Sequence, residues 1–420
     1  MPSSSGYPPS SHPPILDTHI HLFTEERFPH LNWLTSDSPL YANHSLSEYT
    51  KCIPPSLKPY HRGFVFVETD CRYTDPPEHA STTDLSKAWG YVLEEYSYVY
   101  HISQFDEAPI TGRIPVRGIV PWAPVHLGPA MMDRYLELLN VIGGVTLEAH
   151  TGRVKQRKSM LKGFRQLLQD KPRGAMLKDE FVEGLKWIGK KGLIFEVGVD
   201  TRSIGLWQLE ELVALLEKLG NEAPTLVISI YSLCYHNLSR NLLSLVPTDH
   251  LCKPNFHIPP SEVPSHPTFL AYSSLLQQIS TYPTTIMTLS GIFSELPPLP
   301  SNPIPPPFPT TPHLPHSLEP APEDIISHIY PWVSLAFDLF TPERIIWGSD
   351  WPVCNAQYQG SDVEKSCLSA SIRNADAWGA WAGLTDWVLN ELEKEGKING
   401  VNRKGVWGGN GARVYGVDWW

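Results

Sequence analysis

Short apolar runs alternate with longer amphipathic segments along most of this chain. Runs of about five to eight apolar or β-branched residues are typical of buried strands, and apolar residues spaced three and four apart are typical of helices. After a first run from Ile15, strands are expected at Gly63–Thr69, within Ile114–Trp122, and at Leu193–Val199, Leu226–Ile230, Thr285–Leu289 and Arg344–Gly348. Helices are expected at Met131–Ile142, Asp179–Lys190, Leu206–Leu219, Trp332–Phe340 and Ala375–Glu395.

This alternation predicts the fold class. Strands separated by helices pair in parallel through right-handed crossovers. Roughly eight strand candidates favour a closed (β/α)8 TIM barrel with extra C-terminal helices over an open sheet. Leu161–Leu168 fits either period, and in the first predicted helix we place Leu136, Leu139 and Val141 on the apolar side. No GxGxxG follows the first strand, which disfavours a dinucleotide-binding fold.

Proline marks the parts of the chain that do not fit the barrel. The chain has 420 residues and 41 prolines, which is about twice the usual share. We predict a disordered Ser/Pro tail over residues 1–13 and a single barrel domain over residues 14–420. The Pro-rich stretch 296–322 falls between the seventh strand and the next helix, and we interpret it as a surface insertion rather than a shield over the site.

The net charge and the cysteines limit the classes of molecule that this protein can bind and the compartment in which it works. A formal net charge of −11 disfavours nucleic acid and anionic membranes, and no stretch of about 18 apolar residues is present to span a bilayer. The N-terminus lacks the basic and apolar regions of a secretory signal, and the six cysteines form no CxxC pair. We therefore predict a cytoplasmic protein with free thiols that acts on a small molecule. These features are compatible with a homo-oligomer.

The candidate chemistry lies at the two ends of the chain. His19 and His21 are two residues apart at the end of the first strand, so their imidazoles point to the same face. Asp350 follows the last apolar run. If the first and last strands of a closed barrel are neighbours, the three side chains converge on one point, as a metal ion or a polarised carbonyl requires.

Six blocks of sequence resemble one family. LDTHIHLF, GFRQLLQDKP, DHLCKPN, LSGIFSELP, RIIWGSDWPVCN and VWGGNGARVYG resemble the amidohydrolase-related family, and within it fungal sugar-lactone hydrolases of the L-rhamnono-γ-lactonase type. The blocks extend from about Ile15 to Val417. The resemblance implies a barrel with its site at the C-terminal ends of the strands. We interpret the VWGGNGARVYG block, which contains Asn410, as a structural cap on the barrel.

The resemblance also implies roles for single residues. His19, His21 and Asp350 match a metal-ligand set, and Asp350 also matches the catalytic general base. His250 matches a catalytic histidine of the sixth strand, and Arg165 matches a fourth-strand arginine that binds substrate oxygens. The implied cofactor is one divalent ion, Zn or Mn. Because related lactonases include members that work without metal, a metal-independent site is the alternative.

Two positions depart from the family pattern. Many members carry a metal-ligating histidine on the fifth strand, where this chain has Glu196. We assign Glu196 to substrate binding, since a carboxylate on a central strand must be paired or face the site. The block before the Ser-Gly pair usually has a lysine, and Thr288 removes that cation.

A third departure is the segment 229–248, which separates the sixth strand from DHLCKP. It has one charged residue, Arg240, and many Leu and Ser. Two interpretations compete: a real loop insertion, or translated intron sequence. We favour the intron, an interpretation that peptides from this segment in a digest of the native protein would overturn.

Together these features predict a hydrolase that opens a sugar-acid lactone, such as L-rhamnono-1,4-lactone, to the aldonic acid. Asp350 would activate water, the histidines would hold a metal or polarise the carbonyl, and Arg165 would orient the substrate. A non-oxidative decarboxylase of an aromatic or unsaturated acid is an alternative on the same frame. A catalytically degenerate barrel is the third possibility, motivated by Thr288 and the segment 229–248.

Overall fold

The computed structural model describes residues 12–104, 113–155, 158–199, 201, 205–229, 254–290, 323–355 and 377–418. His250, nearly all of the segment 229–248 and the Pro-rich stretch 296–322 lie outside these ranges. Two residues that we assigned to the N-terminal tail, His12 and Pro13, are described. The His12 ring is buried, with its centroid 4.6 Å from that of Trp407, so the ordered chain includes the end of the predicted tail.

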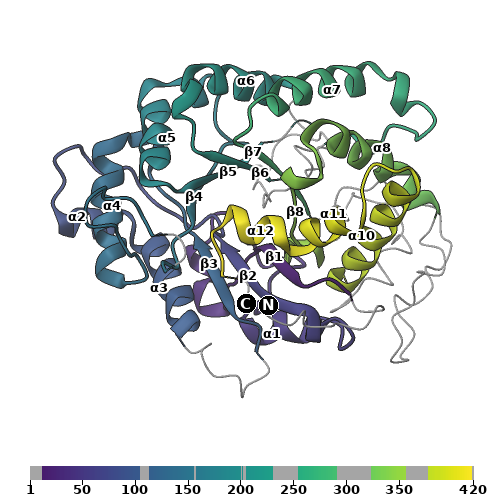
Figure 1. The fold of residues 1–420 in the computed structure, drawn as a ribbon. Coiled ribbons are helices and arrows are strands. Elements are labelled where there is room, and N and C mark those ends of the chain that lie inside the picture. Colours follow the sequence, from purple (N-terminus) through teal and green to yellow (C-terminus); the bar gives the residue numbers. More distant parts are fainter. Residues whose placement is uncertain are drawn as a thin grey trace, which may run out of the picture.

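Eight parallel strands follow one another around the molecule in the described residues (Figure 1). They are β1 (Ile15–Ile20), β2 (His61–Val67), β3 (Val116–Val120), β4 (Gly163–Leu167), β5 (Ile194–Gly198), β6 (Thr225–Ser229), β7 (Thr285–Leu289) and β8 (Ile345–Trp347). Regular parallel ladders join β1 to β3 and β4 to β8.

Backbone hydrogen bonds also join the two groups of strands. Between β3 and β4, the Lys162 amide donates to the Ile119 carbonyl at 3.0 Å. Between β8 and β1, the Asp350 amide donates to the His19 carbonyl at 2.9 Å. Each strand therefore has a partner on both sides, and the predicted (β/α)8 barrel is confirmed.

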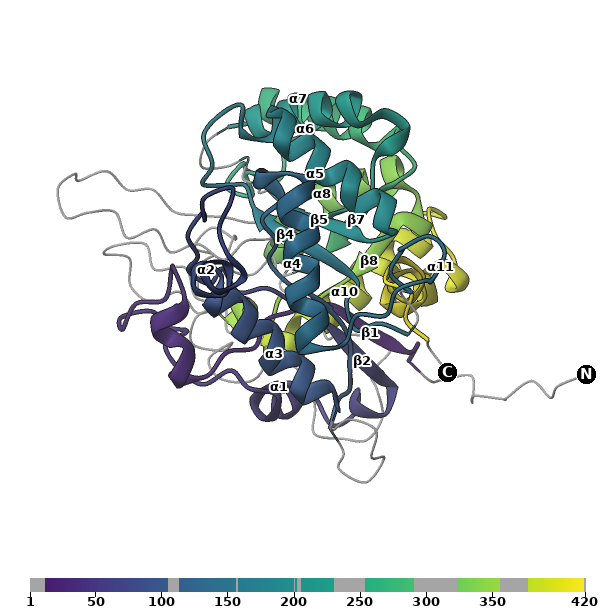
Figure 2. The ribbon, with the colours of Figure 1, turned by 90° about the vertical axis from the view of Figure 1, so that its left-hand side faces the viewer.

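Helices surround the ring of strands (Figure 2). They are α1 (Leu46–Cys52), α2 (Thr82–Ala88), α3 (Gly90–Gln104), α4 (Pro129–Ile142), α5 (Asp179–Lys191), α6 (Trp207–Leu219), α7 (Pro267–Ser280), α8 (Glu323–Phe340), α10 (Ala377–Lys394), α11 (Gly400–Lys404) and α12 (Asn410–Val414). The last three are the predicted extra C-terminal helices. In Figure 1 the yellow α12 lies across one end of the ring of strands.

The barrel interior is a core of its own. It contains inward-facing aliphatic residues of the strands, the last residue of α12 and the tyrosine that follows it: Val65, Val67, Val120, Ile194, Val227, Ile286, Ile346, Val414 and Tyr415. Because side chains alternate along a strand, Glu196 points inward like Ile194, while Phe195 packs outward against the helices. By the same alternation Arg165 points inward next to the outward Phe164. Polar side chains therefore fill the interior above the aliphatic layer.

The structure decides one segment that the sequence left open and corrects two predictions. Leu161–Leu168, which fitted either period, contains strand β4. Val141 is 86% exposed, so its placement on the apolar side of α4 is wrong; it lies two residues beyond the buried Leu139, on the opposite side of a helix. Helix α8 begins nine residues before the predicted start and passes through Pro331.

Sequence patterns did not single out helices α1, α2, α3 or α7. Two of them begin with capping boxes: the Ser45 hydroxyl and the Glu48 carboxylate cap α1, and Ser81 and Asp84 cap α2. None of the helices in the described part of the chain is both long enough and apolar enough to cross a membrane.

Candidate active site

The first strand brings two imidazoles to one place. His19 and His21 are both buried, and their ring centroids lie 5.0 Å apart. The chain of β8 passes close to His19: a Cβ on Gly348 would lie 2.8 Å from the His19 Cβ. Only glycine allows this approach, so Gly348 permits β8 to lie directly against the histidine strand.

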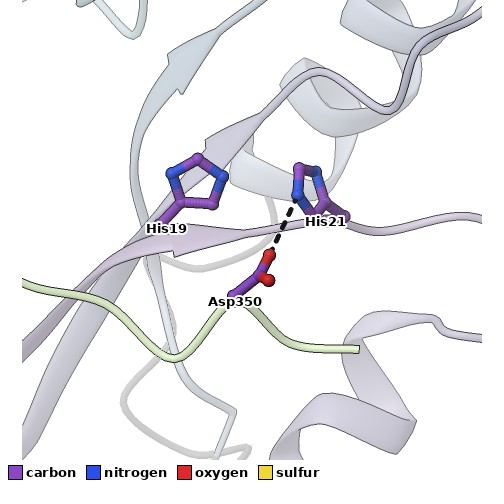
Figure 3. A group of neighbouring side chains, drawn as sticks. All are labelled: His19, His21 and Asp350. Atoms are coloured by element: carbon purple, nitrogen blue, oxygen red, sulfur yellow. Dashed lines mark ion pairs between the residues drawn. The ribbon is translucent and has the colours of Figure 1, made fainter. Parts of the chain in front are cut away.

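The loop after β8 places Asp350 beside these histidines (Figure 3). Its Oδ1 lies 3.4 Å from Nε2 of His21, and both side chains are fully buried. Asp350 has a φ of 57°, a left-handed conformation that aspartate and asparagine tolerate better than most residues. The bond from its amide to the His19 carbonyl fixes this conformation.

Asp17 ties the Asp350 loop to the first strand. One of its carboxylate oxygens accepts the Ser349 amide at 2.8 Å, and the other accepts the Tyr49 hydroxyl and the Trp378 indole N–H, each at 2.9 Å. Burial raises the pKa of Asp17, and these donors act against that shift. The residue before Asp350 is therefore held by a buried carboxylate two positions upstream of His19.

The three side chains meet the geometric requirements of a metal site. In the described residues, ligand atoms of His19, His21 and Asp350 all lie within 4.8 Å of one another. Nδ1 of His21 lies 2.9 Å from the Val67 carbonyl, so this nitrogen carries a proton and Nε2 is the one that can coordinate. Burial, with smaller contributions from His19 and Arg165, lowers the pKa of His21 well below its usual value. A neutral imidazole pair and a carboxylate fit Zn or Mn.

Glu196 contacts His19. Its Oε2 lies 3.2 Å from Nδ1 of His19, and its Oε1 accepts a hydrogen bond from the Tyr415 hydroxyl at 2.6 Å. In the described residues, Glu196 is not in the group whose ligand atoms converge. Its assignment to substrate binding stays a prediction, whereas its observed contacts are those of a residue that orients His19.

Arg165 forms a buried ion pair across the barrel. Its Nη1 lies 3.0 Å from Oε1 of Glu68 and also donates to the Glu68 carbonyl at 3.1 Å. Both side chains are almost completely buried. The nearby surface carboxylate of Asp170 pairs with Lys171 at 3.5 Å. The substrate-binding role of Arg165 stays a prediction.

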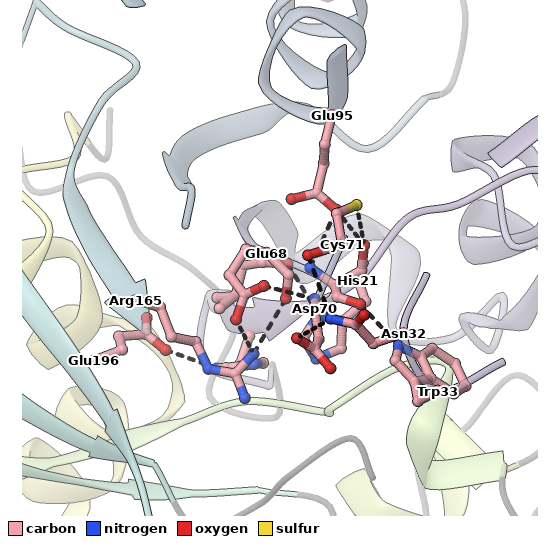
Figure 4. A network of polar contacts seen from close by, with 12 residues as sticks. His21, Asn32, Trp33, Glu68, Asp70, Cys71, Glu95, Arg165 and Glu196 are labelled. Carbon is pink, nitrogen blue, oxygen red and sulfur yellow. Dashed lines mark hydrogen bonds and ion pairs between the residues drawn. The ribbon is translucent and has the colours of Figure 1, made fainter. Parts of the chain in front are cut away.

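Beyond Glu68, the polar network contains two more carboxyl groups (Figure 4). Oε2 of Glu68 accepts the Asp70 amide at 2.6 Å, and Asp70 accepts from the Asn32 side chain at 3.0 Å. Glu95, on α3, accepts the Thr69 amide at 3.1 Å and also bonds the Thr69 hydroxyl. Burial is the main cause that raises the pKa of all three carboxyl groups.

These carboxyl groups make stability depend on pH, and Glu95 provides the test. Its pKa is raised from 4.5 to about 7, so between these values the folded protein holds a proton that the unfolded chain has released. Folding stability should therefore fall as pH rises from 4.5 to 7, by about 3 kcal/mol for this group. Urea unfolding at pH 5, 6, 7 and 8 should show a shallower decline for Glu95→Gln. Glu137→Gln, an exposed substitution on α4, should keep the full decline, and equal slopes for all three proteins would contradict the prediction.

A family model described as Amidohydrolase matches residues 257–416. The L-rhamnono-γ-lactonase of Scheffersomyces stipitis is 29% identical over 350 residues, which cover 81% of this chain and 85% of that protein. This chain is therefore similar to amidohydrolases in sequence, and most clearly so over residues 257–416. The predicted family and the prediction of a hydrolase are confirmed.

A second lactonase and two solved structures are also similar to this chain. The L-fucono-1,5-lactonase of Burkholderia multivorans is 24% identical over 264 residues, which cover 62% of this chain and 64% of that protein. Two crystal structures of an amidohydrolase from the same organism, one with bound HEPES and one with bound zinc, superpose with a TM-score of 0.53 each. They are 19% and 17% identical and cover 96% of this chain and 100% of theirs. They support the barrel fold.

The sequence did not reveal the residues that contact Glu196, Glu68 and Asp17 in the site. Tyr49, Asp70, Glu95 and Tyr415 all contact the network around the site, yet each is an isolated residue in the sequence. Tyr415 belongs to the VWGGNGARVYG block, which we interpreted only as a cap. Thr288 is buried at an inward position of β7, and its hydroxyl has no partner in the described residues.

Proposed function

We propose that this protein opens a sugar-acid lactone, of the L-rhamnono-1,4-lactone type, by adding water to its carbonyl. The observation that carries the proposal is the convergence of His19, His21 and Asp350 at the C-terminal end of the barrel strands. The relatedness to an L-rhamnono-γ-lactonase and an L-fucono-1,5-lactonase supports the substrate class. Thr288 also favours a neutral, polyhydroxylated substrate. Its hydroxyl can donate and accept hydrogen bonds, whereas the lysine that is usual at this position would add a charge.

Each step of the reaction has a candidate residue. Asp350 takes a proton from water as the water oxygen bonds to the carbonyl carbon. The ring C–O bond then breaks, and the proton returns from Asp350 to the leaving alkoxide, which yields the aldonic acid. Arg165 orients the substrate through its guanidinium N–H groups, and His250 remains a predicted catalytic group.

We propose that His19, His21 and Asp350 hold one divalent ion, zinc or manganese. When bound, such an ion polarises a carbonyl oxygen and acidifies water. The zinc-bound amidohydrolase with the same fold is consistent with this choice. A site that works without metal, in which the imidazoles stabilise the developing oxyanion, is the alternative. Cys52 and Cys71 are buried free thiols, as expected in a reducing compartment such as the predicted cytoplasm.

A pH-indicator assay across a panel of aldono-lactones tests the function. Purified protein should release acid from at least one γ- or δ-lactone of a deoxy sugar acid. Chelation should lower that rate by about a hundredfold or more if the site needs a metal, and added zinc or manganese should restore it. An unchanged rate after complete metal removal would select the metal-independent alternative.

The same panel separates the rival functions. No acid release from any lactone, together with carbon dioxide release from a hydroxybenzoate, would replace the lactonase proposal with the decarboxylase. No turnover of either class by folded protein loaded with zinc or manganese would indicate the degenerate barrel.

A further inference from the structure

The C-terminal segment enters the barrel from the end opposite the site. The Asn410 side-chain amide donates to the carbonyls of Pro342 and Ile345, each at 2.8 Å, which fixes α12 to the start of β8. A Cβ on Gly411 would lie 2.5 Å from Cγ2 of Thr18, so glycine allows α12 to lie against β1. These two contacts therefore fix how far the residues after Asn410 reach into the barrel.

This anchoring of α12 places Tyr415 in the barrel interior. Its side chain is completely buried among the inward-facing aliphatic residues of the strands. A core position of this kind would accept phenylalanine, but the hydroxyl reaches Oε1 of Glu196 at 2.6 Å. That length is typical of a charge-assisted bond from a hydroxyl to a carboxylate. Burial and the charge of Glu196 raise the pKa of Tyr415 well above 10, so the hydroxyl keeps its proton and donates it.

Glu196 also contacts a histidine of the first strand. Its other carboxylate oxygen, Oε2, lies 3.2 Å from Nδ1 of His19. A carboxylate at Nδ1 fixes the proton on that nitrogen and directs the Nε2 lone pair to the opposite side. One continuous line of buried contacts therefore extends from the C-terminal segment, through Glu196, to an imidazole of the site.

We propose that Tyr415 is a positioning residue of the metal site: its hydroxyl holds Glu196 against His19 so that His19 presents Nε2 for coordination. The inference rests on the proposed binding of a divalent ion by His19, His21 and Asp350. It assigns a site role to a segment that its sequence marks only as a cap. A purely structural Tyr415 would contribute packing and stability but would leave metal affinity unchanged.

Zinc affinity of the full-length protein distinguishes these roles without reference to any substrate. Zinc dissociation constants would be measured by competition with a chromophoric chelator for the wild type, Tyr415→Phe and Tyr96→Phe. Tyr96 is the matched control, because it is also completely buried and its hydroxyl donates to the Gly143 carbonyl at 2.8 Å, away from the three proposed ligands. Both substitutions remove one buried hydroxyl and keep the ring.

Tyr415→Phe should weaken zinc binding about tenfold, the lower end of the effect seen when a partner of a ligating histidine is lost. Tyr96→Phe should stay within about twofold of wild type. Equal zinc affinities for Tyr415→Phe and wild type would overturn the inference while leaving the metal site in place. A wild-type protein that binds no zinc would overturn both, and the lactone assay would still report separately on the proposed reaction.

A second variant covers the case in which Tyr415→Phe does not fold. Glu196→Gln keeps the size of the side chain and an oxygen for Tyr415, but it removes the negative charge beside Nδ1 of His19. It should weaken zinc binding by about 10- to 100-fold. Unchanged affinity in folded Glu196→Gln would break the line of contacts at its central member and overturn the inference.

Discussion

Replacing Asp350 by asparagine is expected to lower the rate of lactone opening by about a thousandfold or more while the protein stays folded. Removing a positioned general base typically costs about a hundredfold to ten thousandfold in rate, and Asp350 is also a proposed metal ligand. Asparagine is the informative replacement because it tolerates the φ of 57° at this position. Alanine would add backbone strain to the loss of the carboxylate.

The backbone contacts of the loop should survive this substitution. The amide at this position donates to the His19 carbonyl, and its own carbonyl accepts the Cys354 amide at 2.9 Å, so neither bond needs the carboxylate. The Asp17 carboxylate holds the preceding residue through the Ser349 amide. Thermal unfolding of Asp350→Asn should therefore stay close to wild type, which separates a chemical effect from misfolding.

Two measurements on Asp350→Asn separate its two proposed roles. If zinc content falls together with the rate, the carboxylate acts chiefly as a ligand. If zinc is retained and the rate still falls, the carboxylate acts chiefly as the base. Asp338→Asn, which removes an exposed carboxylate paired with Lys397, is the control and should keep nearly full activity. A rate for Asp350→Asn within about tenfold of wild type would rule out both roles.

The parts of the site that the sequence predicted are those that strand geometry determines. His19 and His21 alternate along one strand, so their shared face follows from the period alone. The meeting with Asp350 needed one further assumption, that the first and last strands of the barrel are neighbours. The closed ring supplies that contact, through the bond from the Asp350 amide to the His19 carbonyl.

The partners of the inward-facing residues could not be predicted in this way. From the sequence, Glu196 was expected on a central strand, where its carboxylate must be paired or face the site. Its partners depend on how β5 and β1 are staggered around the barrel and on a tyrosine 219 residues away. Glu68 lies just beyond β2, where the chain leaves the regular strand and Asp70 takes a φ of 55°. Alternation along a strand says nothing about such a position.

Helix boundaries show the same limit. The predicted start of the helix before β8 was Trp332, directly after Pro331, a residue that cannot donate the usual backbone hydrogen bond. The structure continues the helix through Pro331, so the loss of one bond is outweighed by the packing of residues on both sides, including the buried Ile329 and Trp332. Local propensity therefore misplaced an end that tertiary packing decides.

The second large effect concerns stability. Arg165→Met should lower the free energy of unfolding by about 3–5 kcal/mol at pH 8, the usual cost of removing one partner from a buried ion pair. Glu68 is buried, and in the described residues its remaining bond is the one that Oε2 accepts from the Asp70 amide. Its carboxyl group would then lose the guanidinium that favours its charged form in the barrel interior.

The loss should shrink at lower pH. Burial already raises the pKa of Glu68, and the charge of Arg165 acts against that rise. Without Arg165 the pKa rises further, so at pH 5 the folded variant can hold Glu68 in its neutral form. Urea unfolding at pH 5 and pH 8 should therefore give a smaller difference between Arg165→Met and wild type at pH 5. A difference that is the same at both pH values would argue against Glu68 as the group left charged.

The double variant Glu68→Gln/Arg165→Met completes the argument. Replacing both partners removes the two buried charges together, which often costs little, so the double variant should regain most of the stability that Arg165→Met loses. The cycle of single and double variants measures the coupling between the two side chains. Kinetics on the same proteins then separates structure from recognition: if Arg165 also binds substrate oxygens, the restabilised double variant should still show a KM raised about tenfold or more. A double variant with both stability and KM near wild type would leave Arg165 with a structural role alone.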